Sequence, residues 1–281
     1  MANYCSNKMT LTGPQEELER FRELFKDFDY QFTYQAIIPQ PAGLDIPSGS
    51  ANKTAIALYL YQTAANDDIR NLDIELIRKW DKDNSYGLLD QNGDWAKDAM
   101  EKVVAEYGKH RKKIAQYDIS GIPCATPPKA DDWPSSREQL YKYGEQLIRN
   151  VAETGYETWY EWNCANWGVK WDTGDSNEVE ICGECIFLPF SSPWGPPDKV
   201  FKAITEQFPE LTLTVEIDCE GTGCWTITGK AGELSASEVR SYWEDEEDEE
   251  TEEDEEIECE VIGSWIITVK PDESSESDTP V

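Results

Sequence analysis

The segment GYETWYEWNCANWGVKW, residues 155–171, is the most distinctive stretch of the sequence and holds four of its eleven tryptophans. Successive residues of an α-helix lie about 100° apart around the axis, so the segment sorts into two faces. Glu157 and Glu161 lie on one face. The other carries the aromatic and amide side chains Tyr156, Trp159, Tyr160, Trp162, Asn163, Asn166 and Trp167. The pattern predicts an amphipathic helix over residues 155–167 whose aromatic face packs on a sheet.

Local signals predict both ends of this helix. Thr154 and Glu157 have the spacing of a capping box, in which each side chain bonds a free backbone N–H of the first turn. Gly168 suits the left-handed position that follows the last turn of a helix.

The amides in the middle of the aromatic face need hydrogen-bond partners, because a buried amide without one costs about 1–3 kcal/mol. Asn163 and Asn166 either tie the helix to a neighbouring strand edge or form the polar part of a binding groove. With the second alternative in view, Trp159, Trp162, Asn163 and Asn166 are candidate binding residues.

Residues 155–172 and three other segments resemble a known family. The other segments are MANYCSNKMTLTGPQEELERF from Met1, AIIPQP from Ala36 and SSPWGPPDKVFKAITEQFPELT from Ser191. Together they resemble the YubB-type family of plasmid and phage proteins over roughly residues 1–48 and 150–235. The resemblance implies a ferredoxin-like C-terminal domain of unknown function and a mobile genetic element as the setting. It implies no activity and no site residues.

The elements around the aromatic helix predict the fold class. Alternating or apolar patterns predict strands over residues 4–12, 32–38, 179–188 and 211–217. Helices are predicted after Pro14, with Leu18, Phe21, Phe25 and Phe28 on one face, and after Pro196, with Val200, Phe201, Ile204 and Phe208 facing inward. The order strand, helix, strand, insertion, strand, helix, strand predicts an α+β ferredoxin-like sandwich.

The insertion reads as helical. Residues 55–61, 69–80, 95–107 and 138–152 carry apolar side chains at spacings of three and four, and Ser135 with Glu138 forms a second capping box. We therefore expect a helical insertion over residues 49–154 and a core made of residues 1–48 and 155–234.

An internal repeat marks the C-terminal region. IDCEGTGCWTITGK from Ile217 and IECEVIGSWIITVK from Ile257 agree at eight of fourteen positions. The repeat predicts a duplicated β-hairpin, so residues 235–281 are expected to hold an acidic loop, the second hairpin and an acidic tail.

The formal net charge of −32 limits the kinds of molecule that the protein is expected to bind. Twelve of the thirteen residues in 244–256 are acidic, which disfavours direct nucleic-acid binding because lysine and arginine supply affinity for phosphates. Such a run suits a solubilising linker, a surface for a basic partner protein, or mimicry of a phosphate backbone. Its central residues are candidate binding residues: Glu246, Glu247, Asp248, Glu249 and Glu250.

Eight cysteines raise the question of disulfides and metals. We expect free thiols, because the chain is long and carries no visible secretory signal. Cys182 and Cys185 form a CxxC motif, and with Cys219 and Cys224 they are the only candidates for a zinc site. The second pair lacks the usual short knuckle, so we expect neither metal nor cofactor.

Catalytic motifs are missing from the sequence, and we expect no enzyme and no catalytic residues. His110 is the only histidine, and it lies in the basic cluster Lys109, His110, Arg111, Lys112 and Lys113. Cations at the end of a helix offset its carbonyl dipole, which gives the cluster a structural explanation. Neither phosphate-loop pattern nor a run of about eighteen apolar residues occurs, so we expect a cytoplasmic protein without membrane contact.

These observations favour a non-enzymatic acidic protein of a phage or plasmid. Its partner is expected to be a host protein complex with a basic surface, and its effect the inhibition of a defence system that targets nucleic acids. Two alternatives stay open. One is a nucleic-acid-binding module that uses the aromatic helix and residues 109–113, and the other is a hydrolase or transferase without recognisable motif. The sequence leaves a homo-oligomer open.

Overall fold

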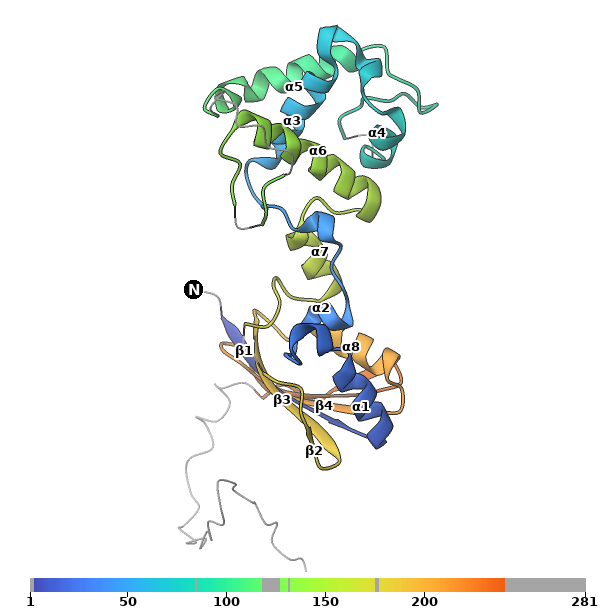
Figure 1. The fold of residues 1–281 in the computed structure, drawn as a ribbon, viewed down its shortest axis with the longest axis vertical. Helices are drawn as coiled ribbons and strands as arrows, with labels where there is room; N and C mark the ends of the chain where they lie inside the picture. Colours follow the sequence, from blue (N-terminus) through green and yellow to red (C-terminus); the bar gives the residue numbers. More distant parts are fainter. Residues whose placement is uncertain (1–2, 84, 118–126, 131, 175–176, 241–281) are drawn as a thin grey trace, which may run out of the picture. The chain divides into compact units, whose positions relative to one another are not determined.

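The computed structural model describes residues 3–83, 85–117, 127–130, 132–174 and 177–240 (Figure 1). One antiparallel sheet of six strands forms the base of the core, in the order β2-β3-β1-β4-β5-β6. The strands are β1 (Tyr4–Thr12), β2 (Ile181–Cys182), β3 (Cys185–Pro193), β4 (Thr212–Cys219), β5 (Gly223–Lys230) and β6 (Glu233–Ala236).

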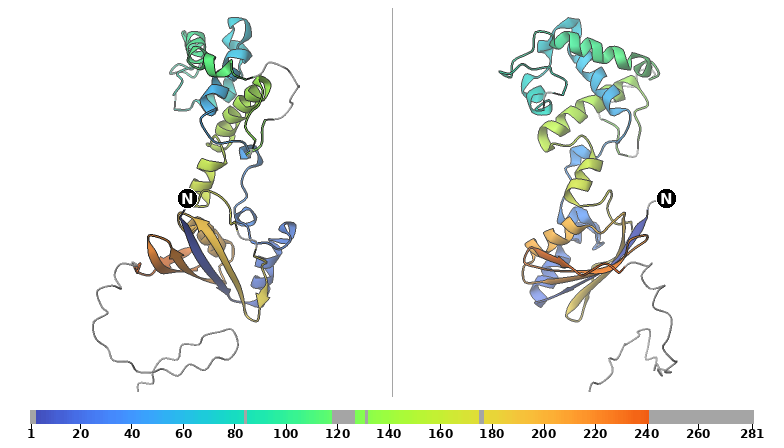
Figure 2. Two further views of the ribbon diagram at one scale, coloured as in Figure 1. Left: turned by 90° about the vertical axis from the view of Figure 1, so that its left-hand side faces the viewer. Right: turned by 180° about the vertical axis from the view of Figure 1, so that it is seen from behind.

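Alternation along β1 decides which face of the sheet is covered. Met9 and Leu11 are fully buried, whereas Lys8 is exposed and Thr10 is only partly buried, as expected where one face meets helices and the other meets water. Met9 pairs with Leu188 of β3 and with Val215 of β4, so the buried rows line up across the sheet. Helices α1 (Gln15–Glu23) and α8 (Asp198–Gln207) lie on this face, as Figures 1 and 2 show.

The order β2-β3-β1-β4 with α1 and α8 on one face is the ferredoxin-like arrangement. The predicted fold class is therefore confirmed, including the first strand, the two covering helices and the strand that begins at Thr212. The hairpin predicted from the first copy of the repeat is formed by β4 and β5.

The strand predicted over residues 32–38 is wrong. This segment forms a short helix, α2 (Tyr34–Ile37), whose first turn is held by a side chain from far along the chain. Asp172 accepts hydrogen bonds from the backbone N–H of Tyr34, at 2.8 Å, and from the Thr33 hydroxyl. The tertiary contact caps the helix and overrides the β-propensity of the local sequence.

The strand predicted over residues 179–188 is interrupted by a turn. Gly183 has a φ of 64°, and it forms a tight hairpin with Glu184 between β2 and β3. Glycine adopts this left-handed conformation without a steric penalty. The ICGEC sequence is thus the turn of a hairpin, not the middle of a strand.

The helical insertion has its own hydrophobic core. It contains α3 (Asn52–Thr63), α4 (Ile74–Trp80), α5 (Ala99–Ile114) and α6 (Arg137–Thr154). Helix α3 is buried from Thr54 to Leu60, as expected for a helix surrounded by others. A Cβ atom at Gly144 of α6 would lie 2.1 Å from the carbonyl oxygen of Ala55, so only glycine lets α3 and α6 approach this closely.

Short 3₁₀ turns complete the described elements, and one capping signal is shifted by a residue. The turns are Lys26–Phe28, Ala42–Leu44, Ala65–Asp67 and Ile69–Asn71. Helix α6 begins after Ser136, whose hydroxyl accepts from the N–H of Gln139 at 3.1 Å. Ser136 is therefore the N-cap in place of the predicted Ser135, and the Gln139 side chain accepts from the N–H and the hydroxyl of Ser135.

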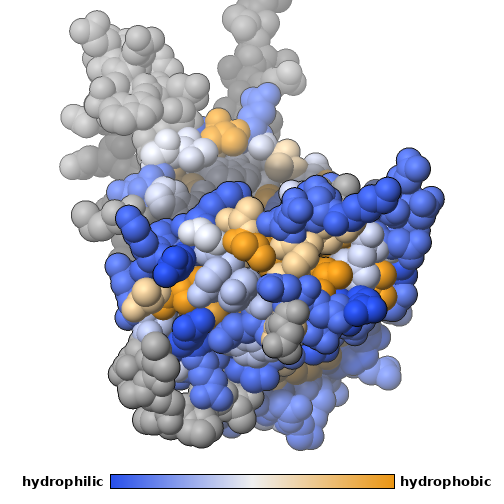
Figure 3. Space-filling view, turned by 90° about the horizontal axis from the view of Figure 1, so that it is seen from above, coloured by the Kyte–Doolittle hydropathy of each residue, from blue (hydrophilic) through white to orange (hydrophobic). Residues whose placement is uncertain are grey.

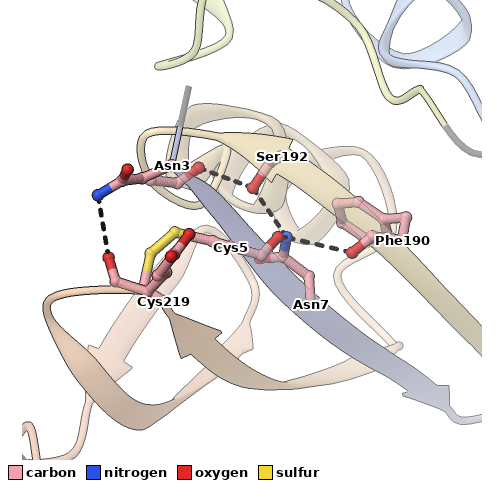
Figure 4. The surroundings of a disulfide bond; sticks show 8 residues. Asn3, Cys5, Asn7, Phe190, Ser192 and Cys219 are labelled. Atoms are coloured by element: carbon pink, nitrogen blue, oxygen red, sulfur yellow. Dashed lines mark hydrogen bonds between the residues drawn. A yellow bond between two sulfur atoms is a disulfide. The ribbon is translucent and has the colours of Figure 1, made fainter. Parts of the chain in front are cut away.

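The expectation of free thiols is wrong for Cys5 and Cys219, which form a disulfide between β1 and β4 (Figure 4). The two residues are direct cross-strand partners with Cα atoms 4.1 Å apart. Strand pairing brings them together across 214 positions, which no sequence spacing reveals. Beside them, the buried Asn7 amide donates to the Ser192 hydroxyl at 2.8 Å.

Several sequence-based expectations lie outside the described residues. These are the acidic run with Glu246, Glu247, Asp248, Glu249 and Glu250, the second copy of the repeat, and the acidic tail.

Candidate functional site

The aromatic helix, α7 (Trp159–Asn166), begins four residues later than predicted. Gly155 has a φ of 84° and ends α6, and Thr154 bonds back to the carbonyl oxygen of Asn150. Thr158 is the N-cap of α7 and donates to Glu161 at 2.6 Å, so a second T-x-x-E pattern supplies the cap. Gly168, with a φ of 86°, follows the helix as predicted.

The aromatic face of α7 packs into the core of the ferredoxin-like fold. Trp162 and Trp167 are 7% and 2% exposed, and their ring centroids lie 5.6 Å apart at nearly a right angle. Trp167 also meets Tyr34 of α2 and donates from its indole N–H to the Ile38 carbonyl. The half-buried Trp159 packs against the same core. The helix therefore reaches the sheet by way of α2.

The two amides have partners within the chain. Asn163 is buried, accepts from the side chain of Gln40 at 2.7 Å and donates to the carbonyl oxygen of Lys170 at 2.9 Å. Asn166 donates to the carbonyl oxygen of Trp162, one turn earlier. Asn163 thus ties the helix to Gln40 and Lys170, which lie in loops and not at a strand edge, whereas the bond of Asn166 stays within the helix.

The cysteine candidates do not form a metal site in the structure. Cys219 forms the disulfide with Cys5, and Cys182 pairs with Cys185 across the β2–β3 hairpin. Within the described ranges, no group of three or more His, Cys, Asp and Glu side chains is placed to hold a metal ion.

His110 connects two helices of the insertion. Its Nδ1 lies 2.9 Å from the hydroxyl of the buried Thr54 on α3, and its Nε2 lies 3.3 Å from Glu106 one turn earlier on α5. Lys109 pairs with the other oxygen of Glu106 at 2.6 Å. The rest of the basic cluster, Arg111, Lys112 and Lys113, lies in the last turn of α5, where cations offset the helix dipole.

A cavity that the sequence does not predict opens in the helical insertion. It measures about 790 Å³ and lies between the start of α3, the chain after α4, one face of α5 and the segment before α7; we call it the α3–α5 cavity. Concave sites with a few convergent polar groups on an apolar floor are the usual places where proteins bind small groups. Leu60, Trp80, Leu88 and Val103 supply the apolar part of its lining.

Three of the four carboxylates that line the cavity differ in their surroundings. Asp81 is buried and caps the loop after α4, because it accepts from the N–H groups of Tyr86 and Leu88. Glu106 is held by Lys109, whose hydrogen bond lowers the pKa of its carboxyl group. Glu157 accepts from the Asn52 amide at 2.8 Å. Among the described residues, no cation pairs with Glu157.

Tyr86 lies near three carboxylates of the cavity. Its ring lies 4.6 Å from that of Trp80, centroid to centroid. Burial, followed by the charges of Glu106, Glu157 and Asp81, raises the pKa of Tyr86 to about 12. Nearby anions oppose the formation of another anion, so the same field favours a cation.

The insertion also shows hydrophobic side chains on its surface. In Figure 3 they gather in the middle of one face, with hydrophilic side chains around them. Val104 and Trp133 are the exposed large apolar residues of the insertion's described part, at 44% and 57%. The Trp133 ring packs on Gly49, which belongs to the cavity lining, and a Cβ atom there would lie 2.6 Å from it.

Comparison with known proteins supports the fold and names no activity. Residues 166–262 match the family model described as the ferredoxin-like domain in Api92-like protein. A crystal structure of a protein api92 from Yersinia pseudotuberculosis is also similar, with 12% identity over 86% of this chain and 100% of that chain and a TM-score of 0.35. No curated protein sequence matches the chain. Among the described residues, no helix is long and apolar enough to span a membrane.

Sequence reasoning missed the α3–α5 cavity because its lining comes from segments as far apart as Gly49 and Glu157. One local signal points to it: Trp80, Asp81 and Tyr86 place two aromatic rings beside a carboxylate within seven residues. No periodic pattern indicates that Glu106 and Glu157 meet there.

Proposed function

We propose that the protein is a non-enzymatic binding protein whose acidic surface engages a basic surface on another protein. The observation that carries this proposal is the distribution of charge. The chain has a formal net charge of −32, and twelve of the thirteen residues in 244–256 are acidic. A field of one sign attracts partners of the opposite sign and speeds their encounter.

The ion pairs of the described residues support this interpretation. Each ion pair among the described residues joins side chains no more than four positions apart, such as Arg20 with Glu17 and Lys202 with Glu206. Exposed pairs at such short spacing contribute little to stability and do not connect distant parts of a fold. Within the described residues, ion pairs therefore do not hold distant segments together, and the acidic surplus stays available to attract a partner.

From the resemblance to plasmid and phage proteins, we infer that the partner belongs to the host cell. Duplex DNA carries one negative charge per about 1.7 Å of axis, and a run of carboxylates offers a basic protein a similar density. A host complex that targets nucleic acids has the basic surface that such a run fits. Inhibition of a defence complex follows as the effect we propose.

The two alternatives have less support. A stacking platform for nucleic acid needs exposed aromatic rings, whereas Trp162 is 7% exposed and Trp167 is 2% exposed. The α3–α5 cavity offers an enzyme its carboxylates, but the pKa of Glu106 is lowered by Lys109, so this carboxyl group is ionised at neutral pH and unsuited to donate a proton. Binding is therefore the better-supported function.

Affinity capture from the host cell tests the proposal. The full chain is compared with a variant in which the twelve acids of residues 244–256 become Gln or Asn. A control variant neutralises the four acids of the tail, Asp272, Glu273, Glu276 and Asp278. We expect the first variant alone to lose a stoichiometric basic partner, with affinity for the purified partner reduced at least about tenfold. Equal affinity in all three chains would contradict the proposal.

A further inference from the structure

We propose that the α3–α5 cavity binds the guanidinium group of an arginine side chain, presented by the basic partner. The inference rests on the proposed function and assigns one anchoring contact of that interaction to a defined site. A guanidinium group is a planar cation with five N–H donors, and it suits a site that combines carboxylates with aromatic rings.

Glu157 supplies the anion. Its carboxylate accepts from Asn52 at 2.8 Å, and this bond fixes its position at the edge of the cavity. Asn52 is itself held, because its amide oxygen accepts from the hydroxyl of the buried Tyr143 at 2.5 Å. A pre-positioned carboxylate without a cationic neighbour among the described residues is a strong acceptor for a charge-assisted hydrogen bond.

The lysines of the cavity do not fill this role. Lys102 donates to the Gly87 carbonyl at 2.6 Å and pairs with Asp98 at 3.0 Å. Lys109 is engaged by Glu106 at 2.6 Å. Lys53 is exposed at the start of α3, and the structure gives it no ion pair. In the structure, none of these three lysines pairs with the carboxylate of Glu157.

Trp80 and Tyr86 supply the aromatic wall. Their rings contact each other at a tilt, and both border the same cavity as Glu157. A cation within about 6 Å of such a ring gains cation–π attraction, which is stronger where water is excluded. Arginine is favoured over lysine because its planar group stacks on a ring while its edge reaches a carboxylate. A cavity of about 790 Å³ has room for this side chain.

Titration of the full chain with agmatine tests the cavity without the partner. Binding is followed by calorimetry in about 150 mM salt, where exposed charges are screened, and by the indole N–H resonance of Trp80, assigned with Trp80→Phe. We expect saturable binding in the millimolar range. Glu157→Gln should weaken it about tenfold or more, because a charge-assisted hydrogen bond is lost.

Two further variants separate this site from general attraction to an acidic chain. Glu153→Gln removes the same charge from an exposed position of α6 and should leave agmatine binding unchanged. Lys109→Gln releases Glu106 and should strengthen agmatine binding by about threefold. No saturable binding, or equal weakening by Glu153→Gln and Glu157→Gln, would overturn the site.

The source of the cation is tested with acetyl-arginine-N-methylamide, which mimics an arginine within a chain. We expect it to bind as agmatine does and to show the same sensitivity to Glu157→Gln. If agmatine binds and acetyl-arginine-N-methylamide does not, the ligand of the cavity is a free organic cation. That result would overturn the proposal that an arginine side chain of the partner binds there. The proposed function can fail separately. If the full chain captures no basic partner but still binds agmatine, the proposed function is wrong and the cavity remains a binding site for a cation.

Discussion

Asp172 illustrates, at the scale of a single residue, how a half-buried carboxyl group shapes the fold. Its carboxylate caps α2 and accepts from the backbone N–H of Tyr34 and of Thr173, both at 2.8 Å. Burial raises the pKa of Asp172, while the bond from Thr33 and those backbone donors act in the opposite direction. Desolvation thus outweighs the capping bonds.

The raised pKa predicts the sign of a pH dependence. The folded state holds the Asp172 proton more tightly than the unfolded chain, so this contribution to stability is present below the unfolded pKa and is lost as the pH rises through the folded pKa. Asp172→Asn removes the contribution. The free energy of unfolding of the wild type minus that of the variant should fall as the pH rises above about 4, the ordinary pKa of an aspartate, as measured by urea unfolding. A difference that rises with pH contradicts this account.

The Cys5–Cys219 disulfide gives a second prediction at this scale. A crosslink between residues 214 positions apart restricts the unfolded chain, and such bonds typically contribute about 2–4 kcal/mol. Replacing both cysteines with alanine should lower the free energy of unfolding by this amount under non-reducing conditions. Dithiothreitol should destabilise the wild type and leave the double variant unchanged. If the reductant affects both proteins equally, the stability does not come from this bond.

Helix α7 shows, at the scale of the element, which features of the fold its sequence predicts. The aromatic face and the terminal Gly168 can be predicted from the local sequence, because they depend on helical spacing and on a single left-handed residue. The first residue of the helix cannot be predicted in this way, since Thr154 and Thr158 both lie three residues before a glutamate. Gly155 decides between them by ending α6 first.

The choice of cap predicts a difference between two threonines. Thr158→Ala should lower the free energy of unfolding by about 1–2 kcal/mol, because it removes the N-cap of α7 and its bond to Glu161. Thr154→Ala should have a smaller effect, since the Thr154 hydroxyl bonds within the end of α6. Chemical denaturation of both variants checks this. A larger loss at Thr154 would place the helix start where the sequence alone suggests it.

Burial predicts a second difference within α7. Trp162 is 7% exposed and meets Trp167, whereas Trp159 is only half-buried. Trp162→Ala should therefore cost about 3–5 kcal/mol, as large core truncations do, and Trp159→Ala should cost less. Thermal and urea unfolding of the two variants measure the order. The reverse order would mean that α7 packs by a different face.

Features that depend on contacts between distant residues could not be predicted from local sequence patterns. The helix α2 requires Asp172, which lies 138 positions after Tyr34, and the pairing of Cys5 with Cys219 requires the register of β1 and β4. The α3–α5 cavity requires four separate segments to converge. In contrast, β1, α1, α8 and β4 follow from alternation and helical spacing within each segment.

The charge acts at the scale of the whole molecule. The ferredoxin-like core and the helical insertion each have a hydrophobic cluster of their own, and the described ion pairs are local to single elements or turns. The ion pairs of the described residues therefore do not connect the two clusters, and the formal net charge of the chain is −32. A surplus of this size keeps a protein soluble and steers the approach of a basic partner.

The salt dependence of the association rate with the captured partner tests this claim most directly. Stopped-flow measurements between about 50 and 200 mM salt compare the wild type with the chain neutralised in residues 244–256. We predict that the wild-type rate constant falls steeply with salt, and that the neutralised chain associates more slowly with a flatter slope and a less affected dissociation rate. Equal rate constants and equal slopes in the two chains would contradict the account.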